Sequence, residues 1–304
     1  MSNPGYWCPV IASSELGTRP LARIRFGERL VFWRSGRNVV CMPDRCPHRS
    51  AALSLGRINL AAGTLACPFH GLEFAADGSC VGVPGEADPG LCEEFRVEPR
   101  SVREADGYIW LWRGPDAGKS ESLPRHPALS GLRYGESRTV WPAHYTRCIE
   151  NVCDYSHLPF VHRWTIGAGN RGKLIHIEME DVPGGFRAHL LQDGERHQCL
   201  EFLYPNLWLL MISERLMLSA VFAPLDDDQT VVYGRTYYRM SFPGIGLLMK
   251  VWTRFSQFLV FREDWPIVAS QLPGDVNEAQ HERLLPSDAP VIAYRKLHRA
   301  YTRP

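Results

Sequence analysis

The sequence predicts an α+β protein of two domains, a small all-β domain followed by a domain in which helices flank an antiparallel sheet. Three observations lead to this prediction. The chain has 304 residues, enough for about two domains. Residues 1–115 read as short strands joined by turns that contain Gly and Asp. Residues 173–242 read as further strands, and a helical apolar pattern follows them.

Composition limits the classes of function. The hydrophobic fraction of 45% and the charged fraction of 22% are ordinary for a globular protein, and a net charge of +1 indicates no nucleic-acid surface. No apolar run reaches the roughly 18 residues that a membrane-spanning helix needs, and the N-terminus lacks a signal-peptide pattern. We therefore expect a cytoplasmic protein with no membrane or nucleic-acid partner.

Clear turns separate the strands of the first region. Residues 30–33 and 38–41 flank a Gly-containing turn and are predicted to form a hairpin. Phe74 and residues 80–83 flank an Asp-Gly turn in the same way. Residues 108–112 form another apolar strand pattern. Short strands at this spacing are typical of a small all-β domain.

The most specific motif pairs one thiol with one imidazole twice, as Cys46-Pro-His48 and Cys67-Pro-Phe-His70. Nine cysteines are too few for a disulfide scaffold, so some are candidate metal ligands. Two thiolates and two imidazoles suit a 2Fe–2S cluster with two ligands of one kind on each iron. A structural zinc site is the alternative, but zinc fingers usually keep the cysteines as one pair and the histidines as the other. The mixed pairs favour the iron–sulfur cluster.

A probable connection follows the first domain. Residues 114–127 are rich in Gly, Pro, Ser and charge, which is typical of an inter-domain linker. We therefore predict a first domain over residues 1–115, a linker over 116–130 and a second domain over 131–304. His126 stands between Arg and Pro and is expected to be exposed to solvent.

The second domain contains alternating strand patterns separated by short turns, which predicts an antiparallel sheet. The predicted strands are residues 138–141, 174–179, 186–191, 197–203, 207–212, 216–222 and 230–240. An apolar stripe at helical spacing predicts a helix over residues 246–271, and a start signal precedes a second helix over residues 291–299.

Residues 151–162 concentrate candidate site residues, namely Asn151, Asp154, His157 and His162. Imidazole is the commonest metal ligand, and a carboxylate near it often orients the ring. A helix would place the first three residues on one face, whereas Pro159 would break the helix and bring His162 back beside His157. Two histidines and one carboxylate form the facial triad of non-haem iron oxygenases. Periodicity does not select the carboxylate from 33 acidic residues.

The Cys-Pro-His-Arg and Cys-Pro-Phe-His-Gly motifs resemble the Rieske domain of the Rieske non-haem iron oxygenases, in the monooxygenase and demethylase branch. The family commonly has Trp where Leu72 stands, and the spacer between the motifs is slightly longer than usual. These departures affect the surroundings of the cluster or donor docking, not its ligands. Respiratory Rieske proteins carry two further cysteines beside the ligands, and none stands there in this chain.

The second domain is similar to the family's catalytic domain in Asn-x-x-Asp-x-x-His-x₄-His and in the later Phe-Arg-Glu-Asp segment. The resemblance implies a helix-grip, START-like domain in which His157, His162 and Asp264 bind mononuclear Fe(II). Glu263 is the nearest competitor for the third position. The resemblance further implies that Asp154 connects His157 to His70 of the partner subunit in a homotrimer. Asn151 would help to gate the iron site.

The family resemblance implies an enzyme that uses O₂ and electrons from NAD(P)H, delivered by a separate reductase or a ferredoxin and reductase. The apolar sheet and late helix suggest a small, largely apolar aromatic or natural-product-like substrate. Hydroxylation or oxidative demethylation is the first choice. Ring cis-dihydroxylation is the alternative, and a pure Rieske electron carrier would need only residues 1–115.

Overall fold

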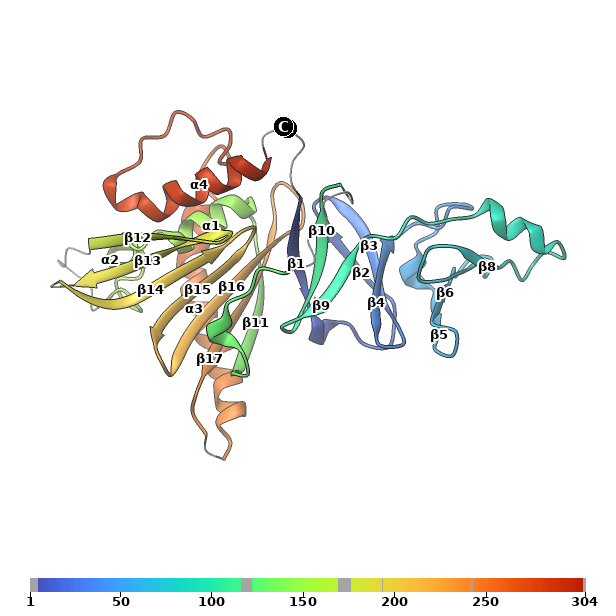
Figure 1. Ribbon diagram of the computed structural model, residues 1–304, viewed down its shortest axis with the longest axis horizontal. Coiled ribbons are helices and arrows are strands. Elements are labelled where there is room, and N and C mark those ends of the chain that lie inside the picture. Colours follow the sequence, from blue (N-terminus) through green and yellow to red (C-terminus); the bar gives the residue numbers. More distant parts are fainter. Residues whose placement is uncertain (1–4, 116–121, 169–175, 193, 242, 303–304) are drawn as a thin grey trace. The chain divides into compact units, whose positions relative to one another are not determined.

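The computed structural model describes residues 5–115, 122–168, 176–192, 194–241 and 243–302. The chain divides into two compact units (Figure 1). One comprises residues 7–113, and the other comprises residues 1–6 with 114–304. Each unit is described by itself.

The unit of residues 7–113 is built from three small sheets (Figure 1). The first has the order β1 (Tyr6–Ala12), β10 (Tyr108–Arg113), β9 (Val102–Ala105). The second has the order β2 (Leu21–Arg25), β3 (Glu28–Ser35), β4 (Asn38–Pro43). The third has the order β5 (Arg57–Asn59), β6 (Thr64–Ala66), β7 (Glu73–Phe74), β8 (Cys80–Gly82). The predicted all-β character is confirmed.

Both predicted turns of this unit connect paired strands. In the first hairpin, Trp33 pairs with Val40, and β3 and β4 are joined through Gly36 at φ 59°. In the second, Gly78 has φ 84°, and a Cβ there would collide with the Val97 carbonyl. Glycine is therefore needed at this turn both for its conformation and for space.

The second unit contains a seven-stranded sheet in which every neighbouring pair is antiparallel. Its order is β11 (Arg133–Trp141), β17 (Thr230–Tyr238), β16 (Leu216–Pro224), β15 (Leu207–Ser213), β14 (Glu195–Leu203), β13 (Gly185–Gln192), β12 (His176–Val182). The first strand thus pairs with the last, and the strands between them follow one another as a meander. This confirms the predicted antiparallel sheet.

Helices cover one face of this sheet (Figure 1). They are α1 (Tyr145–Cys153), α2 (Leu158–Val161), α3 (Ile245–Val268) and α4 (Ala289–Thr302). Ile149, Val268 and Tyr294, from three of these helices, share one buried core with Phe202 and Val232 of the sheet. None of the helices in the described ranges is both long enough and apolar enough to cross a bilayer.

The long helix α3 runs against strand β11 at very short distance. A Cβ at Gly135 would collide with the Met249 carbonyl and the Thr253 hydroxyl, so glycine permits this close approach. The buried side chains of α3 are Ile245, Met249, Thr253, Asp264 and Val268. The buried positions lie near the two ends of α3, and Asp264 belongs to the set near the C-terminal end.

The prediction for His126 is wrong. Its side chain is buried, and its Nδ1 lies 2.6 Å from the Oε1 of Glu201 on β14. Glu201 is itself buried and also accepts a hydrogen bond from Arg187. A buried carboxylate needs hydrogen-bond partners, and His126 is one of them. The residues next to His126 in the sequence do not show this contact, because Glu201 is distant in the chain.

Candidate metal centres

The two Cys-His motifs lie in loops with the same backbone hydrogen bonds. The N–H of Cys46 and of Cys67 each donates to the carbonyl five residues later, at 2.8 Å in both loops. The N–H four residues later donates back to the cysteine carbonyl, at 2.9 and 3.2 Å. That fourth residue has positive φ in both loops, 61° at Ser50 and 77° at Gly71. The two loops therefore hold their cysteines in equivalent backbone positions.

These loops bring the four predicted cluster residues together. Cys46 and Cys67 are 1% and 4% exposed, and burial together with the adjacent Cys67 thiol raises the pKa of Cys46 to about 11. The rings of His48 and His70 are exposed, with centroids 4.7 Å apart. Two adjoining buried thiols and two adjoining outer imidazoles fit the donor set of a Rieske-type 2Fe–2S cluster.

A second group forms in the other unit. One ligand atom each of His157, His162 and Asp264 lies within 4.8 Å of the others. His157 and His162 flank the short helix α2, and their ring centroids lie 5.3 Å apart. Among the described residues this is the cluster of His, Cys, Asp and Glu side chains that is compact enough to hold a metal ion.

The expected single helical face is only partly present. Asn151 lies in the last turn of α1, but the helix ends at Cys153. Asp154 is the C-cap, with extended φ −83° and ψ 121°, and His157 precedes α2. A bend in the backbone, not the helical repeat, therefore brings Asp154 near His157. The predicted break at Pro159 is wrong: Pro159 lies in the first turn of α2, and the helix is interrupted before His157. His162 does lie beside His157, because the two residues flank this short helix.

In the group of His157, His162 and Asp264, the Oδ1 atom of Asp264 faces the Nε2 atoms of both imidazoles without a hydrogen bond. Asp264 Oδ1 lies 2.9 Å from His162 Nε2 and 3.6 Å from His157 Nε2. This oxygen is buried and makes no hydrogen bond within the described part of the chain. A buried carboxylate oxygen that faces two imidazole nitrogens fits a divalent cation, which would compensate its charge.

The outer nitrogens of both imidazoles also face carboxylates. Asp154 Oδ2 lies 3.5 Å from His157 Nδ1, and Glu263 Oε2 lies 2.7 Å from His162 Nδ1. Burial opposes charge on His157, but Asp154 and Asp264 raise its pKa to about 9. The same two imidazoles overcome the effect of burial on Asp264 and lower its pKa. Glu263 contacts the Nδ1 atom of His162, which points away from Asp264 and His157. The geometry therefore favours Asp264 as the third ligand.

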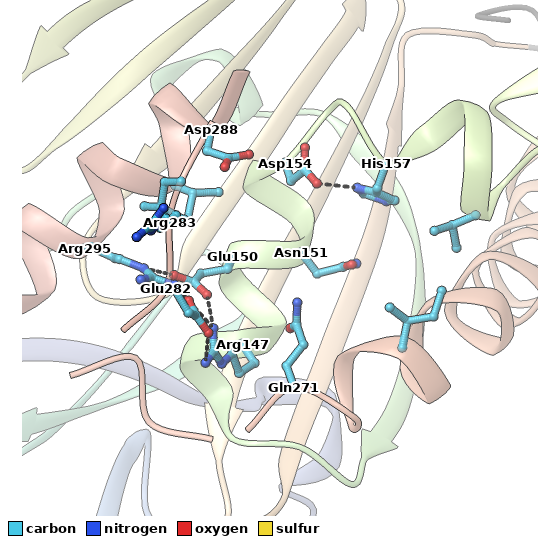
Figure 2. A pocket seen from close by; sticks show the side chains of 14 residues that line it. Arg147, Glu150, Asn151, Asp154, His157, Gln271, Glu282, Arg283, Asp288 and Arg295 are labelled. Carbon is cyan, nitrogen blue, oxygen red and sulfur yellow. Dashed lines mark hydrogen bonds and ion pairs between the residues drawn. The ribbon is translucent and has the colours of Figure 1, made fainter. Parts of the chain in front are cut away.

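A cavity of about 450 Å³ adjoins this group on the side of Asp154 and His157 (Figure 2). Asn151 and Gln271 also line it. The predicted iron site and the predicted bridging carboxylate therefore border one open space. Its remaining lining is strongly charged, in contrast to the apolar pocket expected for the substrate.

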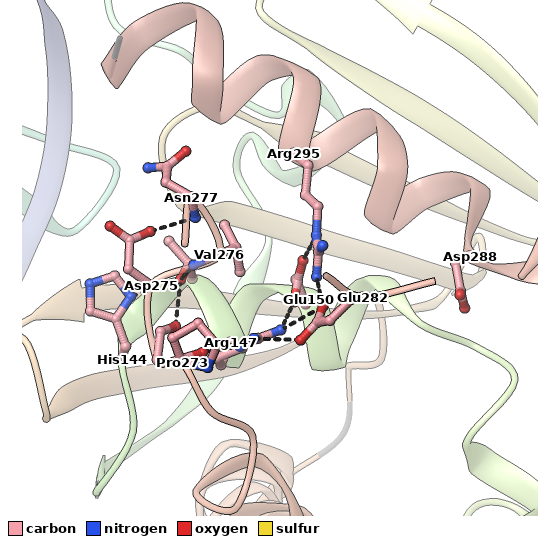
Figure 3. Close-up of polar contacts among 12 residues, drawn as sticks. His144, Arg147, Glu150, Pro273, Asp275, Val276, Asn277, Glu282, Asp288 and Arg295 are labelled. Carbon is pink, nitrogen blue, oxygen red and sulfur yellow. Dashed lines mark hydrogen bonds and ion pairs between the residues drawn. The ribbon is translucent and has the colours of Figure 1, made fainter. Parts of the chain in front are cut away.

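A network of four charged residues, three of them buried, borders the same cavity (Figure 3). Arg147 Nη1 donates to Glu150 at 2.9 Å and Nη2 to Glu282 at 2.7 Å. Arg295 of α4 donates to both Glu150 and Glu282. Only the i,i+3 spacing of Arg147 and Glu150 hints at this network in the sequence. It holds α1, which leads into Asp154, against α4.

Two protein-family models match parts of the chain. The model of the Rieske [2Fe-2S] domain matches residues 6–97, and that of the vanillate O-demethylase oxygenase C-terminal domain matches residues 141–198. Methylxanthine N1-demethylase NdmA of Pseudomonas putida is 31% identical over 191 residues, which are 60% of this chain and 54% of that protein. Vanillate O-demethylase oxygenase subunit of a Pseudomonas strain is 32% identical over 167 residues, 53% of this chain and 45% of that protein.

Solved structures extend the similarity over nearly the whole chain. The structure of NdmA from Pseudomonas putida CBB5 matches with a TM-score of 0.81 and 27% identity, covering 97% of this chain and 89% of that one. Dicamba monooxygenase bound to dicamba has the same fold, with a TM-score of 0.78 at 23% identity over 97% and 96% of the two chains. By sequence, the matches span about half of the curated relatives' length or less.

Proposed function

Because the chain belongs to the Rieske oxygenases, we propose that it hydroxylates or oxidatively demethylates a small, largely apolar aromatic or natural-product-like substrate. It uses O₂ and electrons from NAD(P)H, which a separate reductase or a ferredoxin and reductase deliver. The names of NdmA and of vanillate O-demethylase support this choice of reaction.

In this proposal Cys46, His48, Cys67 and His70 hold a Rieske 2Fe–2S cluster, and His157, His162 and Asp264 hold mononuclear Fe(II). When bound, the cluster supplies electrons and the mononuclear iron supplies the place where O₂ reacts. The presence of both donor sets in one chain is the observation that carries the proposal. An electron carrier would have no use for the second set.

The chain's own residues prepare the second site. Asp264 offers a buried anionic oxygen, and the two Nε2 atoms point toward it. Asp154 lies against His157 Nδ1 and orients the ring. Asn151 borders the same cavity and helps to control access to the site.

The proposed assembly is a homotrimer in which Asp154 connects His157 to His70 of the partner subunit. The support for this step is the position of Asp154 between a cavity and His157. Light scattering coupled to size-exclusion chromatography measures the mass. A monomer at working concentration would contradict the trimer.

Two finer expectations are part of the proposal. The Rieske domain comprises residues 1–115, and residues 116–130 link it to the catalytic domain of residues 131–304. The protein is cytoplasmic, which cell fractionation with an antibody to the chain tests.

Metal analysis and a substrate screen test the function. The oxygenase holds about three iron atoms per chain, whereas an electron carrier holds about two. A screen with a surrogate reductase should read product and peroxide together, because peroxide alone reports unproductive turnover. A chain that carries only the cluster iron would overturn the assignment.

Ring cis-dihydroxylation is the second candidate. Phenoxybenzoate dioxygenase subunit alpha of Ectopseudomonas oleovorans is 32% identical over 228 residues, which favours keeping this reaction open. Mass spectrometry of products formed under ¹⁸O₂ distinguishes the reactions, since a dihydrodiol retains both atoms of O₂ and a hydroxylated product retains one.

A further inference from the structure

Glu263 and Asp264 are neighbours on α3, yet their carboxylates face different nitrogens of one imidazole. Glu263 Oε2 lies 2.7 Å from His162 Nδ1, and Asp264 Oδ1 lies 2.9 Å from His162 Nε2. Successive residues of a helix point about 100° apart. Two adjacent side chains therefore reach opposite edges of the His162 ring, which is 1% exposed.

The two contacts differ in kind. The contact between His162 Nδ1 and Glu263 is a hydrogen bond, whereas Asp264 Oδ1 makes none in the described structure. A neutral imidazole has one N–H, and its other nitrogen has a lone pair. If Nδ1 of His162 carries the proton and donates it to Glu263, Nε2 keeps its lone pair. That lone pair points toward the space between His162 and Asp264.

Further contacts hold Glu263 and the backbone of His162 in place. The hydroxyl of Thr165 donates to the same Oε2 atom of Glu263, at 2.6 Å. The N–H of Gly167 donates to the His162 carbonyl at 3.0 Å, and a Cβ at Gly167 would collide with the Leu158 carbonyl. The segment after His162 therefore folds tightly around it and brings Thr165 to Glu263.

The other imidazole lacks an equally close partner. His157 Nδ1 is 3.5 Å from Asp154 and makes no hydrogen bond within the described residues. Of the two carboxylates that face the outer nitrogens of these rings, Glu263 is the closer, and its contact is a hydrogen bond.

We propose that Glu263 is a positioning residue, not a ligand: it holds His162 as the Nδ1–H tautomer and thereby strengthens Fe(II) binding at the mononuclear site. The inference rests on the proposed function. A carboxylate on the outer nitrogen of a ligating imidazole both fixes its orientation and raises its basicity, and removal of such a partner typically weakens metal binding about 10–100-fold.

The test measures Fe(II) binding itself. Wild type, Glu263→Ala, Glu263→Gln and Asp264→Ala are loaded with Fe(II), and the mononuclear iron is titrated and then challenged with a chelator. Glu263→Ala is expected to weaken binding about 10–100-fold and to speed iron release. Glu263→Gln should restore part of the affinity, since its amide oxygen still accepts the Nδ1 proton. Asp264→Ala should abolish binding.

Two controls separate positioning from loss of fold. The visible absorbance and EPR signal of the Rieske cluster report on the first unit, and circular dichroism reports on the whole fold. Both should be unchanged in the Glu263 variants. Glu214→Ala removes an exposed carboxylate in the β15–β16 turn and should leave iron affinity at the wild-type value.

Wild-type affinity and release rate in Glu263→Ala would overturn the proposal. Complete loss of iron in Glu263→Ala, together with retention in Asp264→Ala, would also overturn it and make Glu263 the ligand. Failure of the proposed function looks different, because the wild-type chain itself would then bind no iron beyond that of the cluster.

Discussion

The Oδ2 atom of Asp154 lies 3.5 Å from the Nδ1 atom of His157. The other nitrogen of the same ring faces Asp264. Asp154 therefore contacts the predicted iron site from outside, at the border of a cavity, without competing for the metal position. This arrangement separates metal binding from the proposed connection to the partner subunit, and it makes the role of Asp154 testable.

Replacement of Asp154 with Asn should leave both metals bound and nearly abolish coupled turnover. Asn keeps the size of the side chain but loses the charge that Asp154 places against His157. Iron content and the Rieske EPR signal should stay at wild-type values, while product formed per NAD(P)H falls steeply. Product formation at the wild-type rate would contradict the bridging role.

Replacement of Cys67 with Ser should remove the cluster and spare the mononuclear site. Cys67 is buried beside Cys46 and is a proposed thiolate ligand. Iron content should fall from about three atoms to about one per chain, with loss of visible absorbance. His157→Ala is the matched control and should retain about two iron atoms with a normal cluster spectrum. Equal losses in the two variants would show that the sites do not load independently.

Replacement of Arg295 with Met should strongly destabilise the second unit. Although burial opposes its charge, the hydrogen bonds that Arg295 donates to Glu150 and Glu282 raise its pKa. The variant leaves the buried carboxylate of Glu150 with Arg147 as its remaining cationic partner. Breaking a buried pair costs about 3–5 kcal/mol of unfolding free energy when the remaining charge has no other partner. Because Glu150 keeps Arg147, we expect a loss at the lower end of this range. Chemical denaturation measures this loss.

The double variant Glu150→Leu/Arg295→Met is the control for this prediction. It removes both charges, so it should be clearly more stable than Arg295→Met alone. Additive destabilisation by the two substitutions would show that Glu150 and Arg295 do not interact energetically.

Acidification should destabilise the protein through His298. Burial, together with nearby His144, lowers the pKa of this side chain to about 4, against the smaller opposing effect of Asp275. An unfolded histidine titrates near pH 6.5. Between these values the unfolded chain binds a proton that the native chain does not, so stability falls as pH decreases, by at most about 1.4 kcal/mol per pH unit.

Thermal unfolding midpoints from pH 7.5 to 4.5 measure this effect. Other groups titrate in the same range, so His298→Gln is the reference. The variant should show a shallower decrease of the midpoint than wild type below about pH 6.5. The same slope in both proteins would exclude His298 as a contributor.

Much of the site could be predicted from the sequence because its ligands come in local pairs. Cys46 with His48, and Cys67 with His70, each occupy one short loop, and the residue types alone indicate the metal chemistry. The strand patterns were equally informative, since alternation with short turns leaves few alternatives to an antiparallel sheet.

Other features depend on contacts between distant segments. His126 has neighbours typical of an exposed linker, yet its ring is buried and in hydrogen-bond contact with Glu201. Asp154 was expected on a helical face, but the helix ends before it and a bend positions its carboxylate. These positions depend on which side chains lose contact with water in the folded protein, and local sequence patterns do not predict this.

The sequence by itself predicted the class of protein, the candidate cluster ligands and the two candidate iron histidines, because these predictions depend on residue types at short spacing. Periodicity does not distinguish Asp264 from Glu263, because both belong to one helix and differ by one position. The family resemblance implied Asp264, and the tertiary structure adds a geometric reason for the same choice. The rotation of α3 against β11 turns Asp264 toward the two Nε2 atoms and leaves Glu263 at the outer edge of His162. His162 and Glu263 are about a hundred residues apart in the chain. The different positions of the two carboxylates therefore depend on tertiary packing.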